Sequence, residues 1–326
     1  MKNVSIVIPV YNEATNIAPL LDSLNRNLKA GEYTYELVFV DDGCTDDSLT
    51  ILKQACFRGQ AVRYISFSRN FGHQNALKAG MDMASGDCII TMDGDLQHPP
   101  ELIPALLKKW EDGYDIVYTR RKDNKKQGWA KRFTSKQFYR LMRFLSGLEI
   151  ERGIADFRLL SRQVCDTLGA FHEQDLFVRG MIKWIGYRQY ALDYTPDNRF
   201  SGRPKYTGKK MTGLALQGIT SFSIKPLYMA IVLGITFCIL SLAYVPYVIW
   251  CVLAGRAVAG WASIIITIMF FGGMQMLLLG IIGIYVGKIF LQSKQRPSYI
   301  VRETNLERKM GTMSLQQAND SPNNER

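Results

Sequence analysis

Two long segments without a charged residue lie near the C-terminal end of this chain and constrain its fold more than any other feature. They cover residues 226–255 and 257–287, with only Arg256 between them. A helix needs roughly 20 mainly apolar residues to cross the hydrocarbon core of a bilayer, and both segments are longer than this. A buried core helix can be equally apolar, but two adjacent segments of this length favour a hairpin of two transmembrane helices.

Basic residues outside the two segments predict their orientation. The connector between them carries a single charge, whereas both outer flanks are rich in lysine and arginine. Because positively charged flanks stay in the cytoplasm, we expect a multi-pass protein of the inner or cytoplasmic membrane with the N-terminal domain and both termini inside. The flanking residues are Lys205, Lys209, Lys210 and Lys225 before the first segment, and Lys288, Lys294, Arg296 and Arg302 after the second.

The net charge of +11 over 326 residues indicates an anionic partner. With two apolar segments present, an anionic bilayer or a phosphorylated lipid is favoured over nucleic acid. A nucleic-acid binder would need stacking aromatic residues on an exposed sheet, so we expect no nucleic-acid partner. The six cysteines are scattered without a C-x-x-C pair, which is typical of reduced thiols.

Strand and helix patterns alternate over the first 120 residues. The continuous apolar run Val4–Val10 suits a strand buried on both faces, and helical spacing follows at Glu13–Lys29. Repeating β-α-β units predict an α/β domain with a mainly parallel sheet, whose ligands bind beyond the carboxyl ends of the strands. Further strands are expected at Glu36–Val40, Val62–Phe67, Cys88–Met92 and Ile116–Thr119, and helices at Asp46–Cys56, His73–Ala84 and Pro100–Trp110.

Three of the expected strands end in acidic or polar clusters. These are Pro9-Val-Tyr-Asn-Glu13, Asp41-Asp42-Gly43 and Asp93-Gly-Asp-Leu-Gln97. One acidic residue at a helix start is usually a cap, but three clusters at one sheet edge repel one another unless a cation neutralises them. A hard divalent cation prefers such oxygens and would hold a diphosphate leaving group. Neither G-x-G-x-x-G nor the P-loop pattern is present, which argues against dinucleotide-binding proteins and P-loop NTPases.

Four motifs together resemble the GT-A-fold family 2 glycosyltransferases. They are Val7-Ile-Pro-Val-Tyr-Asn-Glu13, Val40-Asp-Asp-Gly43, Asp93-Gly-Asp-Leu-Gln-His-Pro-Pro-Glu101 and Ala155-Asp-Phe-Arg-Leu-Leu-Ser-Arg162. Within the family, the chain resembles the polyprenyl-phosphate branch, which includes bactoprenol glucosyltransferases and dolichol-phosphate mannose synthases. The resemblance runs from about residue 4 to residue 300. It implies a GT-A (Rossmann-like) domain followed by two transmembrane helices.

The resemblance also implies roles for individual residues. Asp93 and Asp95 would hold the metal, with Gln97 assisting. Asp156 stands where the family places a carboxylate often assigned as a base. We expect Asp156 and Asp95 to be catalytic residues. A phosphate acceptor is mostly dianionic at neutral pH and does not need a base, so we do not assign base action to Asp156. The nucleotide-sugar donor would contact Pro9, Tyr11, Glu13, Asp41, Asp42, Asp93, Arg199 and Lys205.

Residues 120–143 form a second informative region, with ten basic residues and one acidic residue. Bulky apolar residues are interleaved at roughly helical spacing. This pattern suits a helix at an anionic membrane surface, and a charged, solvated helix is the alternative. The family resemblance implies that Arg121 and Arg132 bind the acceptor phosphate, to which arginine can make bidentate contacts.

Two further segments precede the first apolar segment. The stretch Arg199-Phe-Ser-Gly-Arg-Pro-Lys-Tyr206 resembles the family's R-x-x-G-x-S-K-Y loop, which closes on the donor diphosphate. Pro204 stands where the family usually has serine, while Arg199 and Lys205 remain expected phosphate contacts. From Lys209 to Ile224 an apolar face predicts an interfacial amphipathic helix, with a plain packing helix as the competing interpretation.

The reaction implied by the resemblance is transfer of a hexose, with glucose favoured, from a UDP-sugar to undecaprenyl or another polyprenyl phosphate. It would invert the anomeric configuration at the cytoplasmic membrane face and would use Mg²⁺ or Mn²⁺. One alternative is a glycosyltransferase with a hydroxyl acceptor, similar to polysaccharide synthases, although the chain lacks their Q-x-x-R-W motif. Another is a catalytically silent membrane scaffold, although the expected metal carboxylates are present.

These expectations divide the chain into four parts. Residues 1–205 form the cytoplasmic GT-A catalytic domain, and residues 206–225 form the interfacial helix. Residues 226–290 form the two-helix transmembrane hairpin, and residues 291–326 form a cytoplasmic, largely disordered tail. Glycines in the second apolar segment could support helix packing in a homo-oligomer. They are Gly272, Gly273, Gly280, Gly283 and Gly287.

Overall fold

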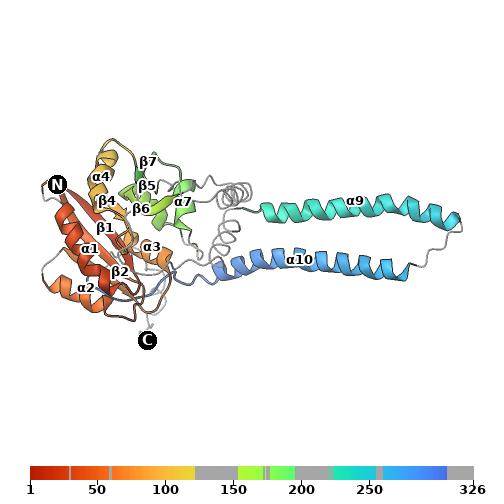
Figure 1. Ribbon diagram of the computed structural model, residues 1–326, viewed down its shortest axis with the longest axis horizontal. Coiled ribbons are helices and arrows are strands. Elements are labelled where there is room, and N and C mark those ends of the chain that lie inside the picture. Colours follow the sequence, from red (N-terminus) through yellow and green to blue (C-terminus); the bar gives the residue numbers. More distant parts are fainter. Residues whose placement is uncertain are drawn as a thin grey trace, which may run out of the picture. The chain divides into compact units, whose positions relative to one another are not determined.

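A computed structural model describes residues 1–28, 31–58, 61–121, 153–171, 173, 177–194, 220, 223–254 and 260–306. The described residues belong to two compact units. The first contains those up to residue 121, those from 153 to 194 and those from 297 to 306. The second contains those from 220 to 296. The first unit is an α/β domain and the second consists mainly of two long helices (Figure 1).

A mixed sheet organises the first unit. Over the described residues it has eight strands in the order β7-β5-β6-β4-β1-β2-β3-β8. The four central strands β4, β1, β2 and β3 are all parallel to one another, as the β-α-β pattern predicts. The strands are β1 (Lys2–Val10), β2 (Tyr33–Asp41), β3 (Val62–Phe67), β4 (Cys88–Thr91), β5 (Ile116–Arg121), β6 (Ile154–Ser161), β7 (Gln189–Tyr194) and β8 (Val301–Thr304).

Helices cover both faces of this sheet because its central strands are apolar on both sides. Ile6 of β1 packs into one core cluster with Leu20 of α1 and Leu106 of α4. On the opposite face, Gly80 of α3 lies so close to Val7 that a side chain there would clash. The helices are α1 (Ala14–Asn27), α2 (Ser48–Phe57), α3 (His73–Met83), η1 (Pro100–Leu102), α4 (Ile103–Glu111), α6 (Arg162–Gly169) and α7 (Val178–Trp184).

Strand β6 departs from the simple parallel pattern. It lies between β4 and β5 and is antiparallel to both. Its first residues therefore reach the same sheet edge as the carboxyl ends of β1, β2 and β4. Thr91, at the end of β4, pairs with Arg158, which places Asp156 two residues further toward that edge. The antiparallel insertion thus adds the start of the Ala155–Arg162 motif, with Asp156, to the predicted ligand-binding edge.

The prediction of a largely disordered tail over residues 291–326 is wrong for residues 301–304. Residues 301–304 form strand β8, which pairs antiparallel with β3 at the edge of the sheet. Lys53 of α2 holds this strand through an ion pair with Glu303, with 2.8 Å between Nζ and Oε2. The exposed edge of β3 provides backbone partners that a four-residue polar segment cannot find alone. Residues 307–326 lie outside the described residues.

The second unit contains α9 (Lys225–Leu253) and α10 (Trp261–Ser293). Among the described residues, one stretch, Phe270–Ser293, is long and apolar enough to cross a membrane. Phe237 of α9 packs edge-on against Phe270 and Phe271 of α10, with ring centroids 5.6 and 5.5 Å apart. Because this one qualifying stretch lies in α10, the two-span hairpin remains a prediction. The expected interfacial helix over 206–225 lies largely outside the described residues.

Candidate active site

The turn after β1 is tied to the loop that follows β2. Asn12 has a left-handed backbone with φ of 55°, and its Oδ1 accepts a hydrogen bond of 2.8 Å from Thr45 N. The backbone N–H of Glu13 donates to Ser48 Oγ at 3.1 Å. Hydrogen bonds therefore connect the turn after β1 with the loop after β2. Of the predicted donor-binding residues, this part of the chain contains Pro9, Tyr11 and Glu13.

Asp41 is fully buried as the last residue of β2. Its Oδ1 accepts the N–H of Cys44 at 2.7 Å, and its Oδ2 accepts the hydroxyl of Ser66 at 2.6 Å. Burial, aided by Asp41, raises the pKa of the Cys44 thiol to about 12. The carboxylate of Asp41 is therefore held by uncharged donors in fixed directions.

Asp42 binds the loop that connects β3 to α3. Its Oδ1 accepts the N–H of Phe71 at 2.7 Å, and its Oδ2 accepts the N–H of Gly72 at 3.0 Å. Burial raises the pKa of Asp42, although these two N–H donors oppose the shift. Gly43 follows with φ of 68°, and a Cβ there would lie 2.5 Å from the backbone carbon of Arg69. Both the φ angle and the close approach explain why glycine occupies this position.

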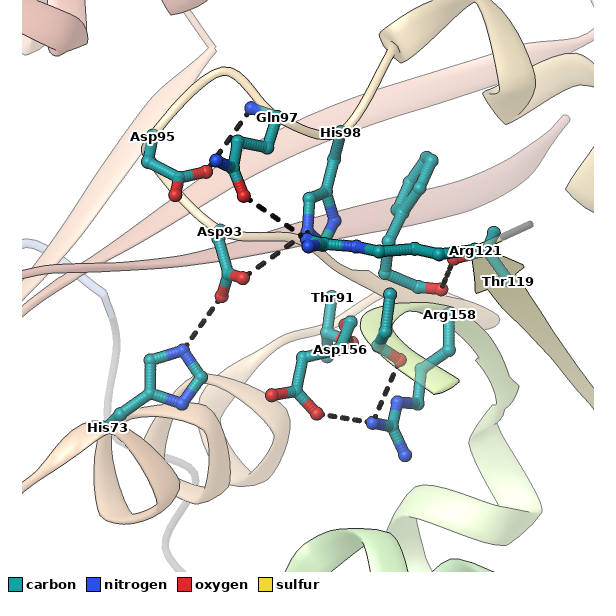
Figure 2. A network of polar contacts seen from close by, with 12 residues as sticks. His73, Thr91, Asp93, Asp95, Gln97, His98, Thr119, Arg121, Asp156 and Arg158 are labelled. Carbon is teal, nitrogen blue, oxygen red and sulfur yellow. Dashed lines mark hydrogen bonds and ion pairs between the residues drawn. The ribbon is translucent and has the colours of Figure 1, made fainter. Parts of the chain in front are cut away.

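Asp93, just beyond β4, lies between two imidazoles (Figure 2). Its Oδ1 is 2.8 Å from Nε2 of His73, which begins α3, and its Oδ2 is 3.3 Å from Nε2 of buried His98. Burial opposes ionisation of Asp93, but the two histidines outweigh it and hold its pKa well below the usual range. Burial also opposes protonation of His73, but Asp93 outweighs it and raises the pKa of His73. Asp93 is therefore a carboxylate whose partners are ionisable.

Asp156 lies beside Asp93 at the start of β6. Thr91 Oγ1 donates to the Asp156 carbonyl oxygen at 2.6 Å, which joins β4 to β6 at this point. The Asp156 carboxylate pairs with buried Arg158 and accepts Nε and Nη2 of Arg179 at 2.9 and 2.7 Å. Burial opposes ionisation, but Arg179 and Arg158 hold the pKa of Asp156 well below the usual range. A carboxylate of such low basicity suits charge placement better than proton abstraction.

Arg121, at the end of β5, extends toward the turn after β4 (Figure 2). Its Nε donates to Tyr194 Oη at 3.0 Å, and its Nη2 donates to Gln97 Oε1 at 3.3 Å. The same Nη2 is 3.4 Å from His98 Nε2. Within the turn, Gln97 N donates to Asp95 Oδ1 at 3.2 Å. The turn therefore fixes a guanidinium next to the imidazole that contacts Asp93.

His73, Asp93 and Asp156 form a group that could hold a metal ion. Each offers one ligand atom, and these atoms lie within 4.8 Å of one another. Carboxylate oxygens suit hard divalent cations such as Mg²⁺ and Mn²⁺, and imidazole nitrogen is a common metal ligand. Arg179, whose side chain is 40% exposed, is one cation that could move aside when a metal binds. The donor set therefore fits a divalent cation, and Asp95 lies on the adjacent turn.

The structure brings several separately predicted residues together. Asp93, Gln97, Asp156 and Arg121 lie around one point at the sheet edge, although Asp93 and Gln97 come from the turn after β4, Asp156 from β6 and Arg121 from β5. Asp95 lies in the same turn. Their individual roles remain predictions. Arg132, Arg199 and Lys205 lie outside the described residues.

Four side chains of this site were not singled out from the sequence. His73 could be mistaken for an ordinary helix-start residue, and His98 stands inside a motif already assigned to its acidic members. Arg158 and Arg179 become site residues only because β6 and α7 bring them to Asp156. Their signal in the sequence is weak, since an arginine that pairs with a buried carboxylate looks like any other arginine until its partner is known.

Comparison with known proteins identifies the family. Residues 5–169 match the model of glycosyl transferase family 2. The chain is 41% identical over 301 residues to the uncharacterized glycosyltransferase YkcC of Bacillus subtilis, covering 92% of this chain and 93% of that protein. It is 38% identical over 300 residues to the bactoprenol glucosyl transferase of Shigella phage SfV, covering 92% and 98%. The chain therefore belongs to glycosyl transferase family 2 and is a glycosyltransferase.

The chain is also similar to solved glycosyltransferase structures. One is glucosyl-3-phosphoglycerate synthase from Mycobacterium tuberculosis in complex with Mn²⁺, UDP and glucosyl-3-phosphoglycerate, at 21% identity and a TM-score of 0.43, covering 67% of this chain and 78% of that one. Another is a mannosyltransferase from Pyrobaculum calidifontis with GDP-Man and Mn²⁺, at 19% identity and a TM-score of 0.46, covering 67% and 63%. The family match and the mainly parallel sheet give the domain the expected GT-A fold.

Proposed function

We propose that this protein transfers glucose from UDP-glucose to a polyprenyl phosphate, such as undecaprenyl phosphate, with inversion at the cytoplasmic face of the membrane. The bactoprenol glucosyl transferase of phage SfV and a prophage homolog of Escherichia coli, 38% and 37% identical over 300 residues, support this acceptor and this sugar. The observation that carries the proposal is the position of Arg121 beside the Asp93 group, because a fixed guanidinium is a strong ligand for a phosphate.

On the donor side, Asp41 and Asp42 would bind the nucleoside, together with Pro9, Tyr11 and Glu13. Asp93 and Asp95 would hold the divalent cation, with Gln97 assisting and His73 as an additional ligand. The cation, when bound, would neutralise the diphosphate and stabilise the charge on the departing UDP. Arg199 and Lys205 would complete the contacts to the diphosphate. Their support is the family resemblance of the loop over residues 199–206.

On the acceptor side, Arg121 and Arg132 would hold the lipid phosphate. Such a monoester has its second pKa near 6, so at neutral pH most of it is already a dianionic nucleophile. Asp156 would therefore have no proton to remove. Its carboxylate, oriented by Arg158 and Arg179, would instead help to position the sugar for displacement at the anomeric carbon. Alignment of the two substrates would supply the remaining rate enhancement.

The membrane part of the proposal rests on α9 and α10. Exposed apolar side chains such as Ile231 and Leu277 on the two helices suit contact with lipid. The basic flanks support a two-helix hairpin over 226–290 with both termini in the cytoplasm. Residues 1–205, completed by β8, would form the catalytic domain, and residues 206–225 would form the interfacial helix. A homo-oligomer through the glycines of α10 would be compatible with this arrangement.

A transfer assay tests the proposal. Purified full-length protein in detergent is mixed with Mg²⁺ or Mn²⁺, a panel of radiolabelled nucleotide sugars and either undecaprenyl phosphate or undecaprenol. We expect label from UDP-glucose to enter the lipid phase with the phosphate acceptor alone. EDTA and the substitution Asp95→Ala should both abolish transfer.

Other outcomes decide between the alternatives. Label on undecaprenol would replace the phosphate acceptor by a hydroxyl acceptor and would restore the need for a base. Transfer from a different donor would correct the sugar. No transfer from any donor, with UDP binding intact, would contradict the lipid-phosphate acceptor and favour a silent scaffold or an acceptor outside the panel.

A further inference from the structure

The β8 segment, residues 297–306, is attached to the sheet beside the residues proposed to bind the donor. Ser68 N donates to Ile300 O at 3.0 Å, and Tyr64 N donates to Asn305 Oδ1 at 2.7 Å. Between these two bonds, β8 pairs with β3. The segment is therefore bonded to β3 and its following loop along its length, although it follows β3 by more than two hundred residues in the chain.

A bulge in β8 changes the direction of one side chain. Ser66 pairs with Glu303 and Phe67 pairs with Val301, so Arg302 is an extra residue on the β8 side of the ladder. Neighbouring residues on a regular strand point to opposite faces, and a bulge redirects the extra one. Here Arg302 Nη2 reaches Ser66 Oγ at 3.1 Å, while Glu303 binds Lys53.

The contact continues from Ser66 to Asp41. Ser66 lies opposite Asp41 in the neighbouring strand pair, and its Oγ donates to Asp41 Oδ2 at 2.6 Å. A serine hydroxyl has one proton, and an arginine can only donate. Arg302 therefore occupies a lone pair of Ser66 and directs the single hydroxyl proton to Asp41. With Cys44 N on Oδ1, both oxygens of this buried carboxylate are fixed.

We propose that Arg302 is a positioning residue of the donor pocket, which acts through Ser66 to hold the Asp41 carboxylate in its nucleoside-binding orientation. The inference rests on the proposed function, in which Asp41 contacts the nucleoside of the donor. It assigns to the post-membrane segment a part in donor binding. Ser66 lies between Arg302 and Asp41, so Arg302 acts on Asp41 only through this serine.

Binding of UDP alone tests this role without acceptor, sugar or turnover. Isothermal titration of the full-length protein in detergent would compare wild type with Arg302→Met, Ser66→Ala and the double variant. Methionine retains much of the arginine stem but donates no hydrogen bond. We expect Arg302→Met to raise the Kd for UDP roughly three- to tenfold, because a charge-assisted but half-exposed hydrogen bond is lost. Arg302→Lys should recover part of the affinity.

Two further comparisons separate positioning from stability. Lys53→Met removes the ion pair that also holds β8 but leaves the contact between Arg302 and Ser66, so its Kd should stay within twofold of wild type. The double variant should bind UDP no more weakly than Ser66→Ala, because both residues act through the same hydroxyl. In turnover, Arg302→Met should raise the KM for UDP-glucose and change kcat by less than twofold.

The outcomes distinguish this inference from the proposed function. Equal losses in Arg302→Met and Lys53→Met, additive losses in the double variant, or an unchanged Kd in Arg302→Met would each overturn the positioning role. Wild-type protein that binds no UDP would overturn the proposed donor, and this inference with it. Tight UDP binding that responds to Arg302 as expected, without transfer to any lipid, would support the inference and contradict the acceptor.

Discussion

Two pairs of aspartates lie at one sheet edge and are held in different ways. Asp41 and Asp42 accept hydrogen bonds from backbone N–H groups and a serine hydroxyl, all of them uncharged. Asp93 and Asp156 contact imidazoles and guanidiniums. Uncharged donors fix a carboxylate without neutralising it, whereas ionisable partners can be exchanged for a metal ion or a substrate. The first pair is therefore suited to rigid recognition and the second to charge rearrangement during a reaction.

The largest expected effect comes from removing charge at the second pair. Asp156→Asn leaves Arg158 buried without a counter-charge, which should cost about 3–5 kcal/mol of unfolding free energy. It should also lower kcat by roughly 100- to 1,000-fold. Asp41→Asn removes contacts to uncharged donors and should cost only about 1–3 kcal/mol. Chemical unfolding followed by tryptophan fluorescence measures both variants, and a larger loss in Asp41→Asn would reverse the comparison.

Substitutions at two glycines near Asp41 and Asp42 test how much the local backbone conformation contributes to stability. Gly43→Ala places a Cβ 2.5 Å from the Arg69 backbone at a φ of 68°, so we expect a loss of about 3 kcal/mol. Gly72 has φ of 97° but nothing within 4 Å of its added Cβ. As a matched control, Gly72→Ala should lose less, about 2 kcal/mol, from backbone strain alone, because its φ of 97° and ψ of 151° are essentially restricted to glycine. Equal losses in the same unfolding experiment would show that the close approach at Gly43 does not matter.

Arg121 extends the comparison to the acceptor side. We expect Arg121→Gln to raise the KM for undecaprenyl phosphate roughly 10- to 30-fold through loss of a charged phosphate ligand, with the KM for UDP-glucose within twofold. Arg120→Gln is the matched control, because Arg120 is the neighbouring residue on β5 and pairs with Asp193 at 2.7 Å. Steady-state kinetics with each substrate varied in turn separates the two constants. A change confined to the donor KM would move Arg121 to the donor side.

The smallest expected effect is on how the unfolding free energy depends on pH, and its direction follows from the ionisation of Asp156. Because the folded pKa of Asp156 is lowered, its ion pairs contribute fully above the ordinary carboxyl pKa near 4 and lose their contribution as the pH falls toward the folded value. The difference in unfolding free energy between wild type and Asp156→Asn should shrink as the pH falls below about 4. A difference that already shrinks between pH 7 and 6 would place the ionisation elsewhere.

The first half of the sheet could be predicted because its signals are local. Continuous apolar runs and helical spacing place β1 to β5 and α1 to α4 within a few residues of their observed bounds. The clusters at Asp41 and Asp93 follow from the ends of parallel strands. Asp156 could be assigned by resemblance alone, because the antiparallel position of β6 is a property of the whole sheet.

The partners of the aspartates could not be predicted, because they depend on contacts between distant segments. His73 reaches Asp93 from the start of α3, and Arg179 reaches Asp156 from α7. Strand β8 was missed because Val-Arg-Glu-Thr is a four-residue polar segment like the tail that follows it. Its strand conformation comes from the free edge of β3, which no local pattern in residues 301–304 records.

The central claim, that Asp41 serves recognition while Asp93 binds the cation, is tested most directly by Mn²⁺ binding. Electron paramagnetic resonance of the full-length protein in detergent, without nucleotide, measures the Kd for Mn²⁺ in wild type, Asp93→Asn and Asp41→Asn. We predict that Asp93→Asn weakens Mn²⁺ binding at least tenfold, because it removes a charged ligand, while Asp41→Asn stays within twofold of wild type. Equal weakening in both variants, or unchanged binding in Asp93→Asn, would contradict the account.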